Sequence, residues 1–400
     1  MPRPRSALIA LALAGWGLAA WFLWQTEVPD DLRLPHVEPG DAVSAGEERA
    51  ASDFEEFLRF DFLLSQVAVV GALALYAVFG PRFLRESASG RIGSGMLLAM
   101  LGLAFVWIVS IPFSVAELWW SRRHDLSEES YGERVLGGWL ALGGEFLFIC
   151  LAILIVMGLA GPLRDRWWIP GGAVFVGLAG LFTFVYPYLI PEQEPLRDPA
   201  LSASAREYAR DLGVEGVGVR VERVGELTDA PNAEAVGLGP TRRVILWDTL
   251  LDPRFSDDEV RVVLAHELGH HARDHLPKSI AWYALFAFPG AFIIARVTRR
   301  RGGMRRPEAV PLGLFMLVAL NLLALPVQNA ITRHLEAEAD WVALETTEKP
   351  DAARALFARF TTEALADPEP PTWAFVLVDS HPTVVERIAM AEAWAERGGR

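Results

Sequence analysis

Cysteine is almost absent from this chain. The 400 residues contain one, Cys150, and it lies within an apolar run. A single cysteine can form no internal disulfide and cannot supply a cysteine-based zinc site, so disulfide frameworks and dithiol redox chemistry are excluded. Any metal ion must therefore be held by histidine, glutamate or aspartate.

Positive charge is also in short supply. Lysine and arginine number 37 against 50 aspartates and glutamates, which gives a net charge of −13. No lysine-rich or arginine-rich surface tract is large enough to grip a phosphate backbone. We therefore expect no nucleic acid among the partners of this protein.

Long hydrophobic runs, in contrast, are abundant. Hydrophobic residues make up 52% of the chain and cluster in runs of about 20 residues, the length that crosses the core of a lipid bilayer. Seven runs predict transmembrane helices, near 6–25, 61–80, 94–116, 136–160, 168–190, 279–297 and 311–331. The first could also be a cleaved signal peptide, but it lacks a convincing small-residue cleavage site, so we interpret it as an uncleaved helix.

Two polar segments, 192–278 and 332–400, border the sixth and seventh predicted spans. They must lie on the same side of the membrane and can fold together. The sequence thus predicts an N-terminal membrane region of five spans, residues 1–190, followed by a catalytic domain, residues 191–400, that includes the last two spans.

The arginines predict which side that domain occupies. One set of loops carries thirteen arginines, namely Arg3, Arg5, Arg82, Arg85, Arg91, Arg164, Arg166 and six within 296–306. The opposite loops, 26–60 and 121–135, carry six arginines among fourteen acidic residues. Because arginine-rich loops stay in the cytoplasm, the catalytic domain is predicted to lie on the extracytoplasmic side. The membrane is predicted to be the plasma membrane of a prokaryote.

The stretch VVLAHELGHHARDH, residues 262–275, predicts a metal-binding helix. Ser256 and the three acids after it form a helix-start signal, so the helix should begin near 257. His266 and His270 are four residues apart on one face, where both imidazoles can bind one Zn²⁺. Glu267 lies beside them, and in an H-E-x-x-H motif this carboxylate takes a proton from a zinc-activated water that attacks a carbonyl.

A third ligand is needed. His271 and His275 follow closely but lie on neighbouring helical faces, so we interpret them as favourable charges at the helix end or as solvated residues near Asp274.

A better candidate lies beyond the last span, in RHLEAEADWVAL, residues 333–344. On a second helix, Glu336 could bind the zinc while Asp340, one turn away, accepts the outer N–H of a ligand histidine. Glu338 points off that face. Without the histidine motif elsewhere in the chain, a solvated acidic helix face would be the simpler interpretation.

Two further pieces are less specific. His381 precedes a proline at a turn or helix start, with Arg387 further along; both could stabilise an oxyanion, although an isolated His-Pro is usually a loop. Asn232 opens a predicted strand that turns at 237–240 and returns as 243–247. This hairpin could be a platform for extended substrates or an ordinary hairpin.

Together these motifs resemble the CAAX prenyl protease family of multi-spanning zinc metallopeptidases. The resemblance covers nearly the whole chain. It rests on HELGH, P-N-A followed by VILWDTLL, E-A-E-A-D at 336–340, S-H-P-x-x-x-x-R-I at 380–388, IPFSVAELWWSRRHDLSEES at 111–130 and YPYLIP at 186–191.

The resemblance implies a predominantly α-helical membrane protein whose seven helices enclose a chamber, with a zincin-like α+β catalytic domain. It implies one Zn²⁺ per chain and substrates that are peptides or membrane-protein segments, lipid-modified tails among them. The implied roles are zinc ligands for His266, His270 and Glu336, general base for Glu267, outer-shell partner for Asp340, carbonyl or Glu336 contacts for His381 and Arg387, and substrate contacts for Asn232 and Ala233. It also implies a cytosolic site, as in eukaryotic members, whereas the arginines predict the opposite side.

Three other functions compete with this one. A site-two-type intramembrane protease also uses H-E-x-x-H, but it buries the motif inside a span, whereas the first turns of this helix are polar, with Asp257, Asp258 and Glu259. A membrane-protein quality-control protease would use the same chemistry. A catalytically inactive scaffold would be expected to lack Glu267 or a ligand, and none is missing.

The orientation can be tested directly. A protease or label applied to intact cells should reach residue 360 from outside. Protection of that residue in intact cells, with access only after lysis, would place the catalytic domain in the cytoplasm instead.

Overall fold

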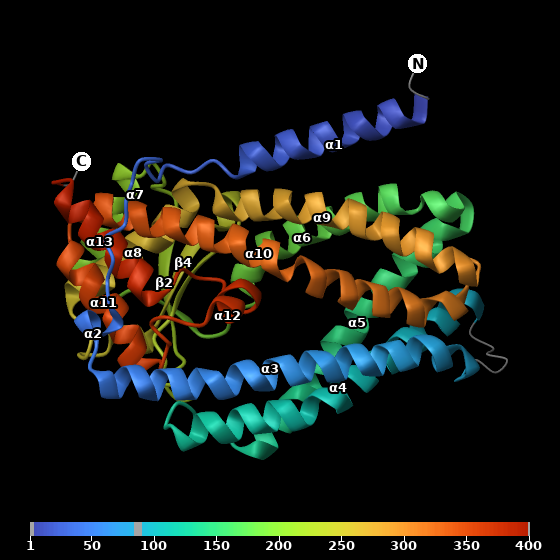
Figure 1. Cartoon of the computed structure of the whole chain (residues 1–400), viewed down its shortest axis with the longest axis horizontal. Helices are drawn as coiled ribbons and strands as arrows, with labels where there is room; N and C mark the ends of the chain where they lie inside the picture. Colours follow the sequence, from blue (N-terminus) through green and yellow to red (C-terminus); the bar gives the residue numbers. More distant parts are fainter. Residues whose placement is uncertain (1–3, 84–89, 399–400) are drawn as a thin grey trace. The chain divides into compact units, whose positions relative to one another are not determined.

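The structure, a computed structural model, describes residues 4–83 and 90–398, so Arg3 and Arg85 lie outside the described residues. The chain is predominantly helical, as predicted (Figure 1). Its helices are α1 Pro4–Leu23, α2 Pro39–Ala42, α3 Ala45–Phe79, α4 Gly90–Arg123, α5 Tyr131–Leu163, α6 Trp168–Val185, α7 Pro199–Asp211, α8 Asp257–Ala272, α9 His275–Thr298, α10 Val310–Thr347, α11 Pro350–Glu363, α12 Thr372–Leu377 and α13 Val384–Glu396. Its strands are β1 Gln193–Pro195, β2 Gly218–Glu222, β3 Ala233–Val236 and β4 Arg243–Trp247.

Length and composition identify the membrane helices. Within the described part of the chain, six helices are long and apolar enough to cross a bilayer: α3, α4, α5, α6, α9 and α10. A shorter apolar stretch, Ala10–Leu23, falls in α1 over the first predicted span. These helices, together with a small four-stranded sheet, confirm the predicted multi-pass, mainly helical membrane protein. The prediction that the membrane helices enclose a chamber stays a prediction.

The last membrane helix is longer than predicted. We expected a span over 311–331 and a separate acidic helix, but α10 runs unbroken from Val310 to Thr347. After the apolar run, the sequence HLEAEADWVALE consists mostly of good helix formers and contains no glycine or proline that would end the helix. Glu336 and Asp340 therefore lie on the same continuous helix as the preceding apolar span.

The chain divides into two compact units, each assembled from separated segments. The second unit comprises Glu56–Gly177 and Phe286–Leu325, and α4 packs against α5 within it. Its buried core includes Tyr76, whose hydroxyl donates a 2.6 Å hydrogen bond to the carbonyl of Leu98. The boundary predicted at residue 190 stays a prediction.

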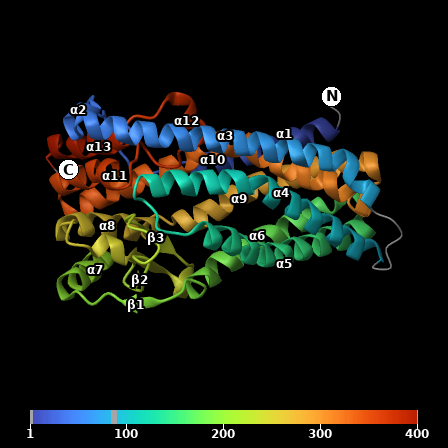
Figure 2. The ribbon, with the colours of Figure 1, turned by 90° about the horizontal axis from the view of Figure 1, so that it is seen from below.

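The first unit comprises Met1–Glu55, Leu178–Leu285 and Pro326–Arg400, and it contains the sheet. The strand order is β1-β2-β4-β3, with β2 and β4 parallel and the outer pairs antiparallel. The predicted hairpin is therefore present as β3 and β4, and β3 is an edge strand. Figure 2 shows the sheet beside α7 and α8.

The metal-motif helix begins where the sequence predicts. Ser256 caps α8 by accepting from the Glu259 backbone N–H, and the Glu259 carboxylate accepts from the Ser256 backbone N–H in return. Apolar residues such as Leu264 and Leu268 are fully buried in the core, together with Trp341 of α10 and Phe357 of α11. This packing fixes α8 against the part of α10 that carries the acidic residues.

The turn after β3 depends on glycine. Gly237 has φ of +89°, and a Cβ there would lie 2.3 Å from the Thr241 carbonyl oxygen. Gly239 also has a positive φ, but a Cβ there would meet nothing within 4 Å. Gly239→Ala should cost only backbone strain, about 1–2 kcal/mol, whereas Gly237→Ala should cost more because the Thr241 backbone must move. Thermal unfolding in detergent should give the lower Tm for Gly237→Ala, and equal Tm values would contradict this account.

Candidate metal centre and substrate cleft

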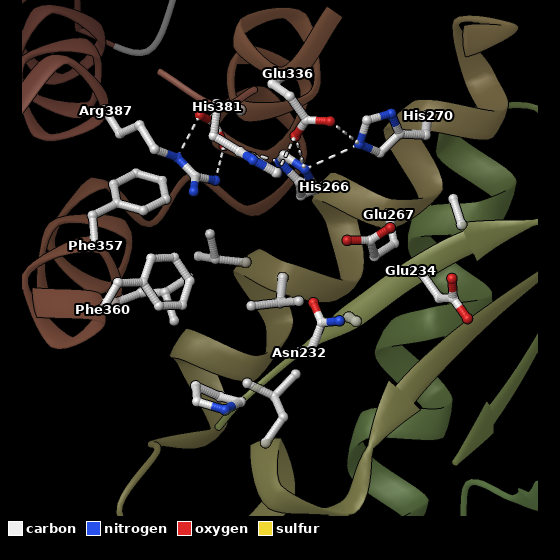
Figure 3. A pocket seen from close by; sticks show the side chains of 18 of the residues that line it. Asn232, Glu234, His266, Glu267, His270, Glu336, Phe357, Phe360, His381 and Arg387 are labelled. Carbon is white, nitrogen blue, oxygen red and sulfur yellow. Dashed lines mark hydrogen bonds and ion pairs between the residues drawn. The ribbon is translucent and has the colours of Figure 1, made fainter. Parts of the chain in front are cut away.

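Two imidazoles from α8 and one carboxylate from α10 converge on one point (Figure 3). The Nε2 atoms of His266 and His270 are 3.1 Å apart. The Glu336 oxygens lie 3.2 Å from Nε2 of His266 and 3.6 Å from Nε2 of His270. Ligands at 2.0–2.1 Å from a tetrahedral zinc are separated by about 3.3–3.4 Å. The observed spacings therefore fit a zinc ion with one further position for a water or substrate.

The two imidazoles differ in their pKa values. Burial lowers the pKa of His270 to about 3, so its imidazole is neutral and has a lone pair to donate. Burial alone would lower the pKa of His266 as well, but its hydrogen bonds with Asp340 and Glu336 raise that pKa to about 10. A proton and a divalent cation thus compete for the space between His266 and Glu336.

The outer nitrogen of His266 is held by a buried ion pair. Its Nδ1 lies 2.9 Å from Asp340 Oδ1. The Arg387 guanidinium donates to both oxygens of Asp340, at 2.8 and 2.6 Å, and stacks over the Phe357 ring at 4.2 Å. The geometry predicted for Asp340 beside a candidate ligand histidine is therefore present, and Arg387 fixes the carboxylate in place.

Glu267 lies beside the cluster without joining it. Its carboxylate is among the groups that line the cavity, near Asn232 and Glu234, and it accepts a hydrogen bond from the Ala235 backbone (Figure 3). Burial raises the pKa of Glu267 to about 7, and the negative charges of Glu336 and Glu234 add to this rise. A carboxyl group with such a pKa can both accept and release a proton near neutral pH.

A cavity of about 290 Å³ lies over these groups. Asn232 and Ala233, predicted as substrate contacts, line it at the start of the edge strand β3. The opposite wall is apolar and is formed in part by Phe357 and Phe360. The cavity thus combines an extended backbone edge with an apolar wall.

His381 approaches Glu336 from the loop before α13. Its Nε2 lies 3.5 Å from Glu336 Oε2, and the side chain is 59% exposed and lines the cavity. This location beside Glu336 is one of the two that the resemblance implied. Arg387 also lines the cavity, and its guanidinium binds Asp340.

His271 and His275 are placed differently from the prediction, whereas Glu338 points off the face of Glu336 as predicted. His271 is buried and contacts the Arg243 carbonyl at 3.0 Å. His275, expected to be a favourable charge at the helix end or a solvated residue, is 2% exposed and contacts both His270 and Glu338. Glu338 does point off the face of Glu336, but toward His275 and not toward solvent. No pattern of residues signals this arrangement, because a change of chain direction at Asp274, with φ of +53°, brings His275 back to His270.

Known proteins resemble this chain in family, sequence and fold. The family described as Peptidase family M48 matches residues 195–395, which is about half of the chain. The chain is 24% identical to an uncharacterized metalloprotease, YhfN, of Bacillus subtilis, over 96% of both chains. It is 25% identical to a CAAX prenyl protease 1 homolog of Oryza sativa, over 90% of this chain and 91% of the relative. The crystal structure of S. mikatae Ste24p has the same fold, with a TM-score of 0.77 at 16% identity over 96% of this chain and 97% of that one.

The fold and the site therefore define a multi-pass membrane metallopeptidase. The chain belongs to peptidase family M48. This confirms the resemblance to CAAX-protease-like metallopeptidases that the motifs indicated.

The buried ion pair can be tested through Arg387. Arg387→Lys should weaken metal binding by about tenfold, because one ammonium cannot hold both oxygens of Asp340 and the carboxylate can turn away from His266. Chelator competition would measure this. The matched control is Arg354→Lys, since Arg354 pairs with Glu392 at the surface, and it should bind the metal as the wild type does. Unchanged affinity in Arg387→Lys would show that the ion pair does not orient His266.

Proposed function

We propose that this protein is a zinc-dependent endopeptidase of the membrane. His266, His270 and Glu336 bind one Zn²⁺, and Glu267 is the general base. The observation that carries the proposal is the convergence of three ligand atoms from two helices, at separations that suit a tetrahedral ion, on side chains that are only 10–13% exposed.

The chain's own groups divide the work of peptide hydrolysis. When bound, the zinc supplies Lewis-acid chemistry, which polarises the scissile carbonyl and lowers the pKa of a coordinated water to about 7. Glu267 takes the proton of the attacking water and passes it to the leaving amine, a role that its raised pKa favours. His381, exposed in the cavity beside Glu336, can donate a hydrogen bond to the developing oxyanion. Arg387 supports the site indirectly by holding Asp340.

The substrate is proposed to bind as an extended chain. Among the residues that the structure describes, β3 pairs only with β4, and its first residues line the cavity, so a peptide can add to its other edge. Asn232 and Ala233 would contact this peptide, and the apolar wall with Phe357 and Phe360 would accept an apolar side chain. Peptides and membrane-protein segments fit this cleft.

A second candidate concerns the substrate. Some relatives are named CAAX prenyl proteases, which favours lipid-modified tails. The arginine distribution favours a catalytic domain outside the cytoplasm, where such tails would not be met, and thus favours a protease of membrane-protein quality control. Two experiments decide between lipid-modified tails and membrane-protein segments as substrates. The first is the accessibility assay on residue 360 in intact cells, and the second compares uncut polypeptides in membranes that contain the wild type or the inactive Glu267→Gln variant.

Glu267→Gln tests the mechanism. The amide keeps the shape of the side chain but cannot take a proton, so peptide cleavage by the purified protein should fall by at least about 100-fold while one zinc per chain is retained. A quenched peptide assay and zinc analysis would measure the two quantities. Unchanged turnover would exclude Glu267 as the base.

Two variants serve as controls. Glu336→Ala should lose zinc as well as activity, and full zinc occupancy would mean that another residue is the third ligand. Asp257→Asn changes an acid on the exposed first turn of the same helix, where it pairs with Arg261, and should leave both zinc and turnover unchanged.

A further inference from the structure

A second buried pair lies behind His270, on the side away from the ligand cluster. His275 and Glu338 are only 2% and 1% exposed. His275 Nδ1 lies 2.8 Å from Nδ1 of His270, and His275 Nε2 lies 2.9 Å from Glu338 Oε2. The three side chains form a continuous hydrogen-bonded row that starts at a candidate zinc ligand and ends at a buried carboxylate.

If a metal ion takes the Nε2 lone pair of His270, one arrangement of protons on the two neutral rings satisfies this row. Nε2 of His270 faces the ligand cluster and must keep its lone pair to bind a metal, so its proton is on Nδ1. Nδ1 of His275 then accepts that proton's hydrogen bond, which places the proton of His275 on Nε2, where it donates to Glu338. Each nitrogen of both rings therefore has a defined role.

The backbone brings His275 to this position. α8 ends at Ala272, and α9 begins only three residues later at His275. Asp274 between them adopts φ of +53°, a conformation that aspartate tolerates better than most residues. The resulting change of direction turns His275 back toward His270.

The far end of the row is fixed by the segment after α1. The backbone N–H of Glu27 donates a 2.8 Å hydrogen bond to Glu338 Oε1, and Lys278 Nζ lies 3.3 Å from Glu338 Oε2. The Glu27 carboxylate is paired with Arg273. Both oxygens of Glu338 are thus occupied, and the carboxylate cannot rotate away from His275 without losing these partners.

We propose that His275 and Glu338 are positioning residues, which hold the Nε2 lone pair of His270 on the metal. The inference rests on the proposed zinc site and deepens it. The outer N–H of His266 donates directly to the Asp340 carboxylate, whereas the outer N–H of His270 donates to the His275 imidazole, which in turn donates to the Glu338 carboxylate. Such outer partners fix the tautomer and orientation of a ligand histidine.

The first experiment measures metal affinity. Purified full-length His275→Ala should bind zinc about 10–100-fold more weakly than the wild type in chelator competition. Replacing zinc by Co²⁺ should give visible absorption bands that shift in the variant, because the orientation of His270 changes. His271→Ala is the matched control, since His271 is equally buried but contacts a backbone carbonyl. It should lower the Tm and leave zinc affinity and the cobalt spectrum unchanged.

The second experiment separates positioning of His270 from simple packing. Asn places an acceptor where Nδ1 of His275 lies, so His275→Asn keeps the bond from His270 and loses the donor to Glu338. Gln places a donor where Nε2 lies, so His275→Gln keeps the bond to Glu338 and loses the acceptor for His270. Zinc affinity should be partly rescued by Asn and not by Gln. The opposite order would show that His275 only satisfies Glu338, and it would overturn the inference.

The outcomes also separate this inference from the proposed function. If the wild type bound no stoichiometric zinc, or Glu336→Ala bound it normally, the zinc site itself would be wrong. If the wild type bound one zinc per chain and the Ala, Asn and Gln variants at position 275 bound it equally tightly, the positioning role alone would be overturned. Where His275→Ala does not fold, the Asn and Gln pair carries the decision.

Discussion

The meeting of two imidazoles with one carboxylate is the interaction on which the rest of this molecule depends. His266 and His270 lie on a short capped helix, α8, while Glu336 lies on α10, which follows one further apolar helix, α9, and carries an apolar span of its own before the carboxylate. Buried ionisable groups are costly unless they are paired or bind a metal. The core between α8, α10 and α11 therefore brings each of these groups to a partner. The cavity lies over this cluster and is lined in part by the edge strand β3 and by His381.

The two sides of the cluster are supported in different ways. On the side of His266, a carboxylate and a guanidinium form a closed, charge-paired unit against aromatic rings. On the side of His270, a neutral imidazole separates the ligand from the carboxylate, and that carboxylate is shared with a lysine and a backbone N–H from near the start of the chain. The segment at Glu27 thus contacts the carboxylate behind the candidate metal centre, although 311 positions in the sequence separate Glu27 from Glu338.

Local patterns made part of this architecture predictable. Spacing by four placed His266 and His270 on one face, the capping box fixed the start of α8, and apolar runs located the membrane helices. The acidic pair on α10 was predictable as well, because i and i+4 residues share a face. Contacts that depend on a change of chain direction could not be predicted from the sequence. The left-handed backbone conformation of Asp274 turns His275 into a buried position. The helical spacing of Glu338 shows which face of α10 it occupies, but it does not show that His275 lies opposite. The continuity of α10 was missed because the end of an apolar run is not the end of a helix.

The continuity of α10 also links the acidic residues to an interruption inside their own helix. Pro326 lies inside the helix, where it cannot donate the backbone hydrogen bond that the preceding turn would otherwise receive. Glu336 is ten residues further along, about 15 Å at 1.5 Å per residue. From Pro326 onward, α10 belongs to the same compact unit as the helix that carries His266 and His270. A change of curvature at the proline would therefore carry these three side chains together, and their mutual distances would be insensitive to bending of the apolar part of α10.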